Sequence, residues 1–249
     1  MRRLVPLTGI AAFVAVWHVV VALSPGTLVP APVEAGRALV ELAEKGLLVR
    51  YVVASLFRVT WGYLAALFVA IPLGVLLGLW RRGERAFNPI LQLLRPISPL
   101  AWIPMAILWF GVGDLSAMFL IFLASLLPLV TSTIHAVHGI EAQHLAAGRN
   151  FGLTHEELVR SVVLPAILPQ LIVGMRLTLG IAWLVVVAAE MIAVNSGLGF
   201  LIVDARNAGN RYDLVVAGMI LIGVIGVGLD LLMRQLERLP SLRWGYATG

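Results

Sequence analysis

The sequence predicts an all-α membrane protein, and composition, apolar segment length and charge placement each support that fold class. Of its 249 residues, 60% are hydrophobic and only 12% are charged, with a mean hydropathy of +0.97. These values lie well outside the range of soluble domains. Apolar runs of membrane-spanning length recur along the chain, and arginines cluster in the short polar segments between them. The net charge of +5 comes from these segments and forms no basic stripe of the kind that binds nucleic acid.

Six apolar segments predict about six transmembrane helices. They are Leu4–Leu23, Val59–Trp80, Leu100–Val112, Leu115–Val137, Leu171–Val194 and Leu214–Met233. The first follows Met1-Arg2-Arg3 as a secretory signal would, but its apolar run of about 20 residues exceeds a signal core and predicts an uncleaved anchor helix. The third is short and contains Pro104, with Pro99 just before it. A broken helix at membrane depth is tolerated only where protein or water covers it, so residues 97–111 are a candidate pathway element.

The distribution of basic residues predicts that both termini are cytoplasmic. Cytoplasmic segments then carry eleven arginines and outer segments carry five basic residues, which agrees with the positive-inside rule. The inner set is Arg2, Arg3, Arg81, Arg82, Arg85, Arg95, Arg149, Arg160, Arg234, Arg238 and Arg243, and the outer set is Arg37, Lys45, Arg50, Arg206 and Arg211; Arg58 and Arg176 lie at or within helices. On the outer side, Leu39, Val40, Leu42 and Leu47 recur at roughly helical spacing and predict a short surface helix.

The cytoplasmic segment from Gly139 to Pro169 predicts two helices and a tight turn. Thr154 followed by Glu157 is a capping box, in which each side chain binds a backbone amide of the other residue. Gly152 stands where a first helix, roughly Glu141–Phe151, needs a left-handed residue to end. Pro165 is expected to stop the second helix, and the next span is expected to begin near Pro169. The result is a compact hairpin at the membrane surface.

The chain lacks the motifs of an enzyme. The HEELV sequence at His155–Val159 lacks the second histidine of a zinc protease helix, and His135 with His138 has no third ligand nearby. Lys45, the only lysine, has no phosphate-binding loop around it, so the chain itself is not expected to bind ATP. Two energy sources remain open for a transporter: an ATPase on another subunit, or an ion gradient used by a secondary transporter acting alone.

Two acidic residues and one arginine lie within the predicted spans. Glu190 and Arg176 are about 21 Å apart along one helix, too far to pair with each other. Asp230 is one turn from Arg234, which favours an i,i+4 surface pair. Arg176 is a candidate for attracting an anion, with a structural contact to inner-end carbonyls or the hairpin as the alternative.

The hairpin placed before the penultimate span resembles the coupling loop of permease subunits in binding-protein-dependent ABC importers. Alignment on Leu164-Pro165 puts the conserved glycine of that pattern at Gly152 and its Glu-Ala-Ala triplet at Ala146-Ala147-Gly148, so two triplet positions differ. The segments Arg95–Asp114, Met175–Ile192 and Ser196–Asn207 resemble the subfamily that imports nitrate, sulfonates and taurine, and the resemblance covers roughly Ala54–Trp244.

The resemblance implies a type I ABC importer permease fold, with residues 1–52 as anchor and outer surface helix and 53–249 as the core, including a coupling loop at 139–169. It implies a bacterial inner-membrane location, a homodimer, two cytoplasmic ATPases that hold ATP and magnesium, and a solute-binding protein. No cofactor is expected on this chain, and the expected solute is a small anion. A heterocyclic vitamin precursor is the alternative substrate class within the same subfamily.

The resemblance and the spans together give two sets of candidate residues. The ATPase-coupling set is Ala146, Ala147, Gly148, Gly152, Thr154, Glu157, Leu164 and Pro165, and the pathway or gate set is Trp102, Pro104, Arg176, Trp183 and Glu190. Glu190 lies four residues before its span ends, near the outer face, where a charge costs less than at mid-bilayer. We expect it to hold an outer gate by accepting hydrogen bonds from a neighbouring helix or the Gly197–Asn207 segment.

Overall fold

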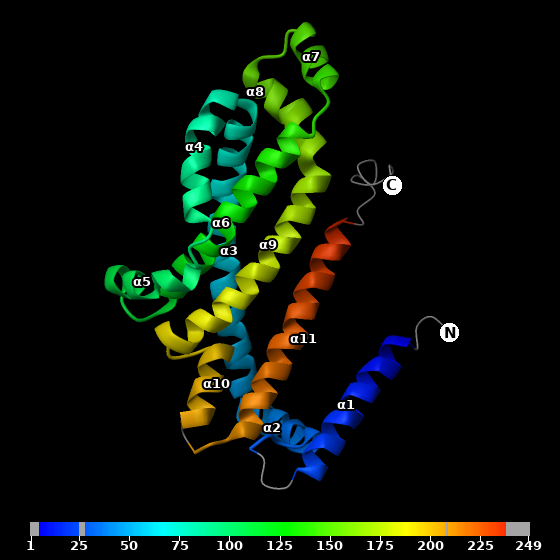
Figure 1. Ribbon diagram of the computed structural model, residues 1–249, viewed down its shortest axis with the longest axis vertical. Helices are drawn as coiled ribbons and strands as arrows, with labels where there is room; N and C mark the ends of the chain where they lie inside the picture. Colours follow the sequence, from blue (N-terminus) through cyan, green and yellow to red (C-terminus); the bar gives the residue numbers. More distant parts are fainter. Residues whose placement is uncertain (1–4, 25–27, 208, 238–249) are drawn as a thin grey trace.

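The computed structural model describes residues 5–24, 28–207 and 209–237, and every regular element in these ranges is helical (Figure 1). Its α-helices are α1 Val5–Leu23, α2 Pro32–Glu44, α3 Leu47–Leu79, α4 Arg81–Leu94, α5 Ile103–Phe110, α6 Asp114–His138, α7 Ala142–Asn150, α8 His155–Leu158, α9 Leu164–Ala193, α10 Leu198–Asn207 and α11 Tyr212–Glu237; a 3-10 turn at Pro99–Trp102 precedes α5 and a π turn at Val159–Val163 joins α8 to α9. The predicted all-α class is confirmed. Leu4 and the four basic residues Arg2, Arg3, Arg238 and Arg243 of the charge tally lie outside the described residues.

Four helices in the described part of the chain are long and apolar enough to cross a membrane: α3, α6, the continuous helix His155–Ala193, and α11. The predicted number of six is therefore approximate. The α4 helix and the Pro99–Phe110 segment form a pair bent by 81°, which counts as one further span at most. In α1 the apolar stretch Thr8–Leu23 is shorter than these spans.

The predicted third span, Leu100–Val112, is not a complete helix. Pro99 opens the 3-10 turn and Pro104 stands in the first turn of α5, where a missing amide donor costs no hydrogen bond. Gly111, with φ of +75°, then ends α5 after eight residues. The expected break at this depth is present, but the prolines begin short helices instead of kinking a long one.

The second span begins twelve residues earlier than its predicted start at Val59, because α3 runs from Leu47. The predicted boundary between residues 52 and 53 therefore falls inside α3. The predicted short helix is confirmed as α2, with Leu42 buried and Val40 exposed, while Leu47 already belongs to α3; its place on the outer side stays a prediction.

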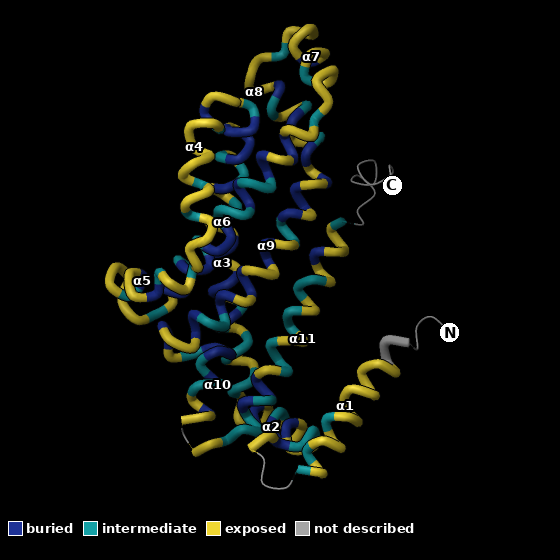
Figure 2. Tube along the Cα trace, in the orientation of Figure 1, coloured by how far each residue is buried: buried dark blue, intermediate teal, exposed yellow. Residues whose placement is uncertain are grey.

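The core consists of α3, α6 and α9, which share the most extensive contacts and hold most of the buried residues (Figure 2). Glycines on α3 permit this approach, since a Cβ added at Gly62 would lie 2.8 Å from the Met118 carbonyl oxygen, and one at Gly78 would lie 2.7 Å from the Val137 Cβ. Small residues at such crossings allow helix backbones in membranes to pack closely. In contrast, α1 is exposed along most of its described length.

The two ends of the bundle carry different elements. The α7–α8 hairpin projects beyond one end, and α2 and α10 lie at the other (Figure 1). The α3 and α9 helices run between these two ends (Figure 1).

Candidate functional site

The α7–α8 hairpin has the two end signals that its sequence predicts. Gly152 adopts φ of +77°; its amide donates to the Arg149 carbonyl and the next amide, of Leu153, donates to the Gly148 carbonyl, which completes a Schellman motif. The Thr154 amide donates to the Glu157 carboxylate at 2.8 Å, and the Glu157 amide donates to the Thr154 hydroxyl at 3.4 Å. The predicted glycine stop and capping box are both confirmed, and they give the hairpin a defined shape.

The prediction that Pro165 stops the second helix is wrong. The chain remains helical from His155 to Ala193, so the span does not begin near Pro169. A π turn at Val159–Val163 precedes the proline, and the Leu164 amide donates to the Val159 carbonyl five residues back. The wider turn leads directly into the first turn of α9, where Pro165 needs no intrahelical partner for its nitrogen.

The triplet that replaces Glu-Ala-Ala has two exposed alanines and one buried glycine. Ala146 and Ala147 face outward, and Gly148 packs against α8, where an added Cβ would lie 2.6 Å from the Leu158 Cδ1. Gly148 therefore allows α7 to approach α8 closely. Leu164 and Pro165 are exposed at the start of α9, next to this hairpin. The coupling role of these residues stays a prediction.

At the opposite end of the bundle, Glu190 is completely buried and fully hydrogen-bonded. Its carboxylate accepts from the Ser55 hydroxyl at 2.8 Å, the Arg58 guanidinium at 2.7 Å and the Gly199 amide at 3.0 Å. The exposed fractions of Glu190, Ser55 and Arg58 are 0%, 0% and 2%. The hydrogen bonds expected from a neighbouring helix and from the 197–207 segment are thus present, and they join α3, α9 and α10.

Arg58 connects this buried carboxylate to the surface. Its guanidinium also donates to the Ser196 carbonyl at 2.7 Å, to the Ser196 hydroxyl, and to Asp114 at 2.8 Å. Asp114 is the first residue of α6, and its side chain is 54% exposed. A cavity of about 530 Å³ adjoins this pair and is lined by Arg50, Phe57, Arg58, Asp114 and Ser196 among others.

Sequence reasoning missed Arg58 as the partner of Glu190. The predicted span begins at Val59, which places Arg58 at a helix end, whereas the structure places Arg58 inside α3. The signal was available, because a buried carboxylate in an apolar span requires a donor of opposite charge, and Arg58 lies within a long apolar stretch.

The turn before α10 is built around the same carboxylate. Gly197 adopts φ of +104°, and a Cβ at this position would overlap the Glu190 carboxylate. A Cβ at Gly199 would overlap the Val187 carbonyl oxygen of α9. Both glycines therefore bring the α10 backbone onto α9, which places the Gly199 amide within hydrogen-bonding distance of Glu190.

Arg176 has partners that were not predicted. Its guanidinium donates to Asp230 at 2.6 Å and to Glu237 at 3.3 Å, both on α11, and Asp230 also accepts from Arg234 at 2.9 Å. The predicted Asp230–Arg234 pair is confirmed. Two carboxylates already neutralise Arg176, so its geometry supports a connection between α9 and α11 instead of an anion-attracting site.

The aromatic candidates pack mainly within the protein. Trp183 is 5% exposed and donates its indole N–H to the Ile222 carbonyl of α11 at 3.0 Å. Trp102 is half-buried, with its ring centroid 6.4 Å from that of Trp109, and Pro104 is exposed at the start of α5. Trp183 thus joins two helices, and the Trp102–Pro104 segment remains the candidate with a surface free to line a pathway.

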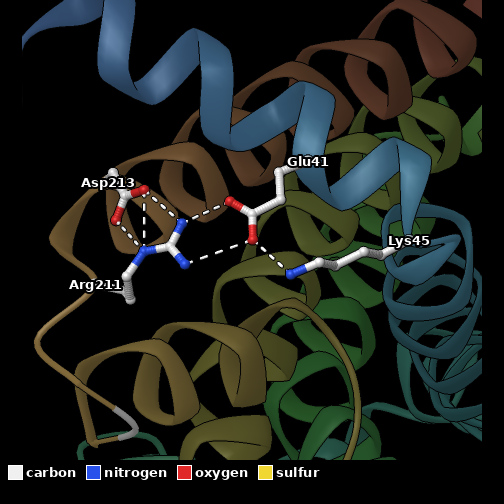
Figure 3. A network of polar contacts seen from close by, with 4 residues as sticks. All are labelled: Glu41, Lys45, Arg211 and Asp213. Carbon is white, nitrogen blue, oxygen red and sulfur yellow. Dashed lines mark hydrogen bonds and ion pairs between the residues drawn. The ribbon is translucent and has the colours of Figure 1, made fainter.

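An ion-pair network holds α2 to the turn before α11 (Figure 3). Arg211 donates to Glu41 at 2.7 Å and to Asp213 at 2.8 Å, and Lys45 donates to Glu41 at 2.6 Å. These cations lower the pKa of Glu41 to about 2, and the carboxylates raise the pKa of Arg211. Arg211 is therefore engaged by carboxylates within the chain.

A helical bundle with several helices long and apolar enough to cross a membrane, and a capped hairpin beyond one end, defines an integral membrane protein. The chain belongs to the family described as "Binding-protein-dependent transport system inner membrane component", whose model matches residues 70–241. The predicted family is confirmed. The family assignment makes the chain a multi-pass membrane subunit of a binding-protein-dependent transport system.

Relatives from three organisms support this membership. The chain is 42% identical over 193 residues to a putative ABC transporter permease of Methanocaldococcus jannaschii, covering 77% of this chain and 72% of the relative. It is 35% identical to a putative aliphatic sulfonates transport permease of Bacillus subtilis, with 94% and 85% covered. It is 32% identical to a nitrate import permease of Synechocystis, with 94% and 88% covered.

A solved structure confirms the expected fold. The inward-facing MetNI methionine ABC transporter has a chain that superposes with a TM-score of 0.69, covering 77% of this chain and 95% of that one, at 21% identity.

Proposed function

We propose that this chain forms the translocation pathway of an ATP-driven importer for a small anion such as nitrate, a sulfonate or taurine. Two copies form the pathway, and two separate cytoplasmic ATPases hold ATP and magnesium. A periplasmic or lipid-anchored protein delivers the solute to the outer face. Substrate entry and release follow alternating access, driven by ATPase movement through the α7–α8 hairpin.

The observation that carries this proposal is the construction of the hairpin in a member of this family. A Schellman motif and a capping box define both sides of its turn, and Gly148 packs α7 directly on α8. A loop that is fixed in this way transmits a push, and the continuous helix His155–Ala193 extends from it through the bundle. The anionic substrate class is supported by the relatives named for sulfonate transport and nitrate import.

The Arg58–Glu190 centre is the proposed outer gate. It joins α3, α9 and the start of α10, and its one exposed member, Asp114, lies beside a cavity of 530 Å³. Separation of Asp114 from Arg58 would free the start of α6 while the buried Glu190 keeps the guanidinium in place. Glu190 itself repels an anion, so the binding protein and exposed cationic side chains attract the solute.

The proposed orientation has both termini in the cytoplasm. The α7–α8 hairpin and the C-terminal end of α11 lie toward the same end of the bundle, opposite α2 and α10 (Figure 1). Arg81, Arg82, Arg149 and Arg160 lie on elements at the hairpin end, in agreement with the positive-inside rule.

Purification of the tagged chain from its native membranes in mild detergent tests the assembly. We expect an ABC ATPase to co-elute in equal molar amount, and two copies of the chain per particle by mass measurement. A chain that elutes alone from membranes that contain such an ATPase would contradict the proposal. Thermal-shift screening of the partner binding protein against nitrate, taurine, alkanesulfonates, bicarbonate and pyrimidine precursors then identifies the solute, and stabilisation by the pyrimidine precursors alone would overturn the anion assignment.

A further inference from the structure

A cavity of 460 Å³ lies under the hairpin, at the junction of four helices. The ends of α3 and α6 and the starts of α4 and α7 meet there. Its lining residues are Gly78, Leu79, Trp80, Arg81, Arg82, Val137, His138, Ile140, Ala142, Leu145 and Arg149. The cavity thus contacts both the hairpin and the membrane-spanning core.

The charged residues that line this cavity are all basic. Arg81, Arg82 and Arg149 line it, all three are exposed, and none of them forms an ion pair with a carboxylate in the described part of the chain. Nearby Arg160, by comparison, pairs with Glu156 at 2.8 Å. The carboxylate of Glu84 lines an adjoining cavity and contacts His138 at 3.2 Å.

The start of α7 adds backbone donors to this positive surface. Its N-cap residue, Glu141, forms no side-chain cap, and its carboxylate instead accepts from Gln143 and faces His144 at 3.8 Å. The His144 amide donates to the Glu141 carbonyl at 3.0 Å, which leaves the amides of Ala142 and Gln143 in the first turn without a side-chain acceptor, and Ala142 lines the cavity. Uncapped helix N-termini favour anions, and the C-terminal ends of α3 and α6 favour the arginines that face them.

We propose that this cavity binds a phosphate-bearing anion through Arg82, Arg149 and the α7 amides. Guanidinium groups bind phosphate with two parallel hydrogen bonds, which suits a site lined by several arginines. The phosphate belongs either to an anionic lipid headgroup at the membrane surface or to a free phosphate in the cytoplasm. A phosphate bound in this cavity connects α7 to the α3–α4 junction, and so restricts movement of the hairpin relative to the core. This site is separate from the outer gate and independent of the transported solute.

The test uses the assembled transporter, permease with ATPase, in detergent. The midpoint of thermal unfolding is followed while short-chain phosphatidylglycerol, phosphatidylcholine of the same chain length, or inorganic phosphate is titrated. We expect phosphatidylglycerol or phosphate to raise the midpoint in a saturable manner. In the double variant Arg82→Gln with Arg149→Gln, the ligand concentration for half the effect should rise about tenfold or more, as expected for loss of charged hydrogen bonds. The matched control is Arg85→Gln with Arg95→Gln, which removes two inner arginines that do not line this cavity.

A response to phosphatidylglycerol alone supports the site and assigns the lipid headgroup; a response to inorganic phosphate as well supports it and assigns free phosphate. Equal weakening in both double variants would overturn the proposal, because it would reflect general surface charge. The proposal would also be overturned if the wild-type complex gave no response to either ligand. If the Arg82→Gln, Arg149→Gln variant then also lost the ATPase, the cavity would be assigned to an acidic side chain of the ATPase.

Discussion

Arg58 on α3 and Glu190 on α9 form an ion pair of 2.7 Å, with side-chain exposed fractions of only 3% and 0%. They are 132 residues apart in sequence, and Glu190 also contacts Gly199 of α10, the helix that lies at the end opposite the hairpin (Figure 1). A buried pair of this kind contributes little net stability compared with apolar residues, but removal of one member leaves an uncompensated charge.

Arg58→Met should therefore destabilise the protein strongly, by about 3–5 kcal/mol, because Glu190 would remain buried without a counter-charge. Arg58→Met combined with Glu190→Met should recover much of this loss. The measurement is the thermal unfolding midpoint in detergent, with exposed Arg50→Met on the same helix as control. Equal midpoints for Arg58→Met and Arg50→Met would show that the pair does not hold the helices.

Glu190→Gln tests the gate role at nearly constant side-chain volume. The amide can still accept from Gly199 but loses the charge that holds Arg58. We expect lower uptake together with altered ATPase stimulation by the binding protein, since the outer gate would open without its normal trigger. Unchanged uptake and unchanged stimulation would leave Glu190 with a packing role only.

Gly199→Ala should cost about 1–3 kcal/mol, because the added methyl group would overlap a backbone carbonyl of α9 that cannot move aside. Gly180 lies within α9, and a Cβ added there has nothing within 4 Å. Gly180→Ala should therefore leave stability unchanged or increase it by up to about 1 kcal/mol. Unfolding midpoints of the two variants give the comparison. A Gly199→Ala protein as stable as Gly180→Ala would contradict the close α9–α10 contact.

Much of the hairpin could be predicted from local sequence, because its end signals act over three or four residues. Gly152 and the Thr154–Glu157 box are such signals, and both are present as expected. Pro165 misled the prediction because proline is compatible with two outcomes, a helix end or a first turn, and the π turn that decided between them has no clear sequence signal. The Arg58–Glu190 and Arg176–Asp230 pairs each join two different helices. Hydropathy along the sequence does not show which helices pack together, so it could not predict these partners.

Thr154→Ala should loosen the hairpin without unfolding the bundle. Loss of an N-cap costs about 1 kcal/mol, equivalent to about fivefold faster amide exchange in the turn that it caps. Hydrogen exchange of residues 155–158 measures this effect, and Thr131→Ala, which removes a hydroxyl bonded to the Leu127 carbonyl, is the control. Exchange that is unchanged in Thr154→Ala but faster in the control would contradict the role of the capping box.

The Glu41–Arg211 contact should make the outer surface sensitive to acid. The pKa of Glu41 falls from an ordinary 4.5 to about 2 in the folded protein, so its contribution is complete above pH 4.5 and is lost as the pH falls toward 2. The difference in unfolding midpoint between wild type and Arg211→Gln should shrink over this window. It should also shrink in 1 M salt, since both side chains are accessible to solvent. A constant difference between pH 6 and 2 would contradict this assignment.

ATP-driven uptake into proteoliposomes tests the central claim most directly. The assembled transporter, with its binding protein on the outer side and ATP on the hairpin side, should accumulate labelled taurine, an alkanesulfonate or nitrate. Uptake should stop when ATP is replaced by a non-hydrolysable analogue and persist when ion gradients are collapsed. Uptake that continues without ATP and disappears with the ion gradient would contradict the account and identify a secondary transporter.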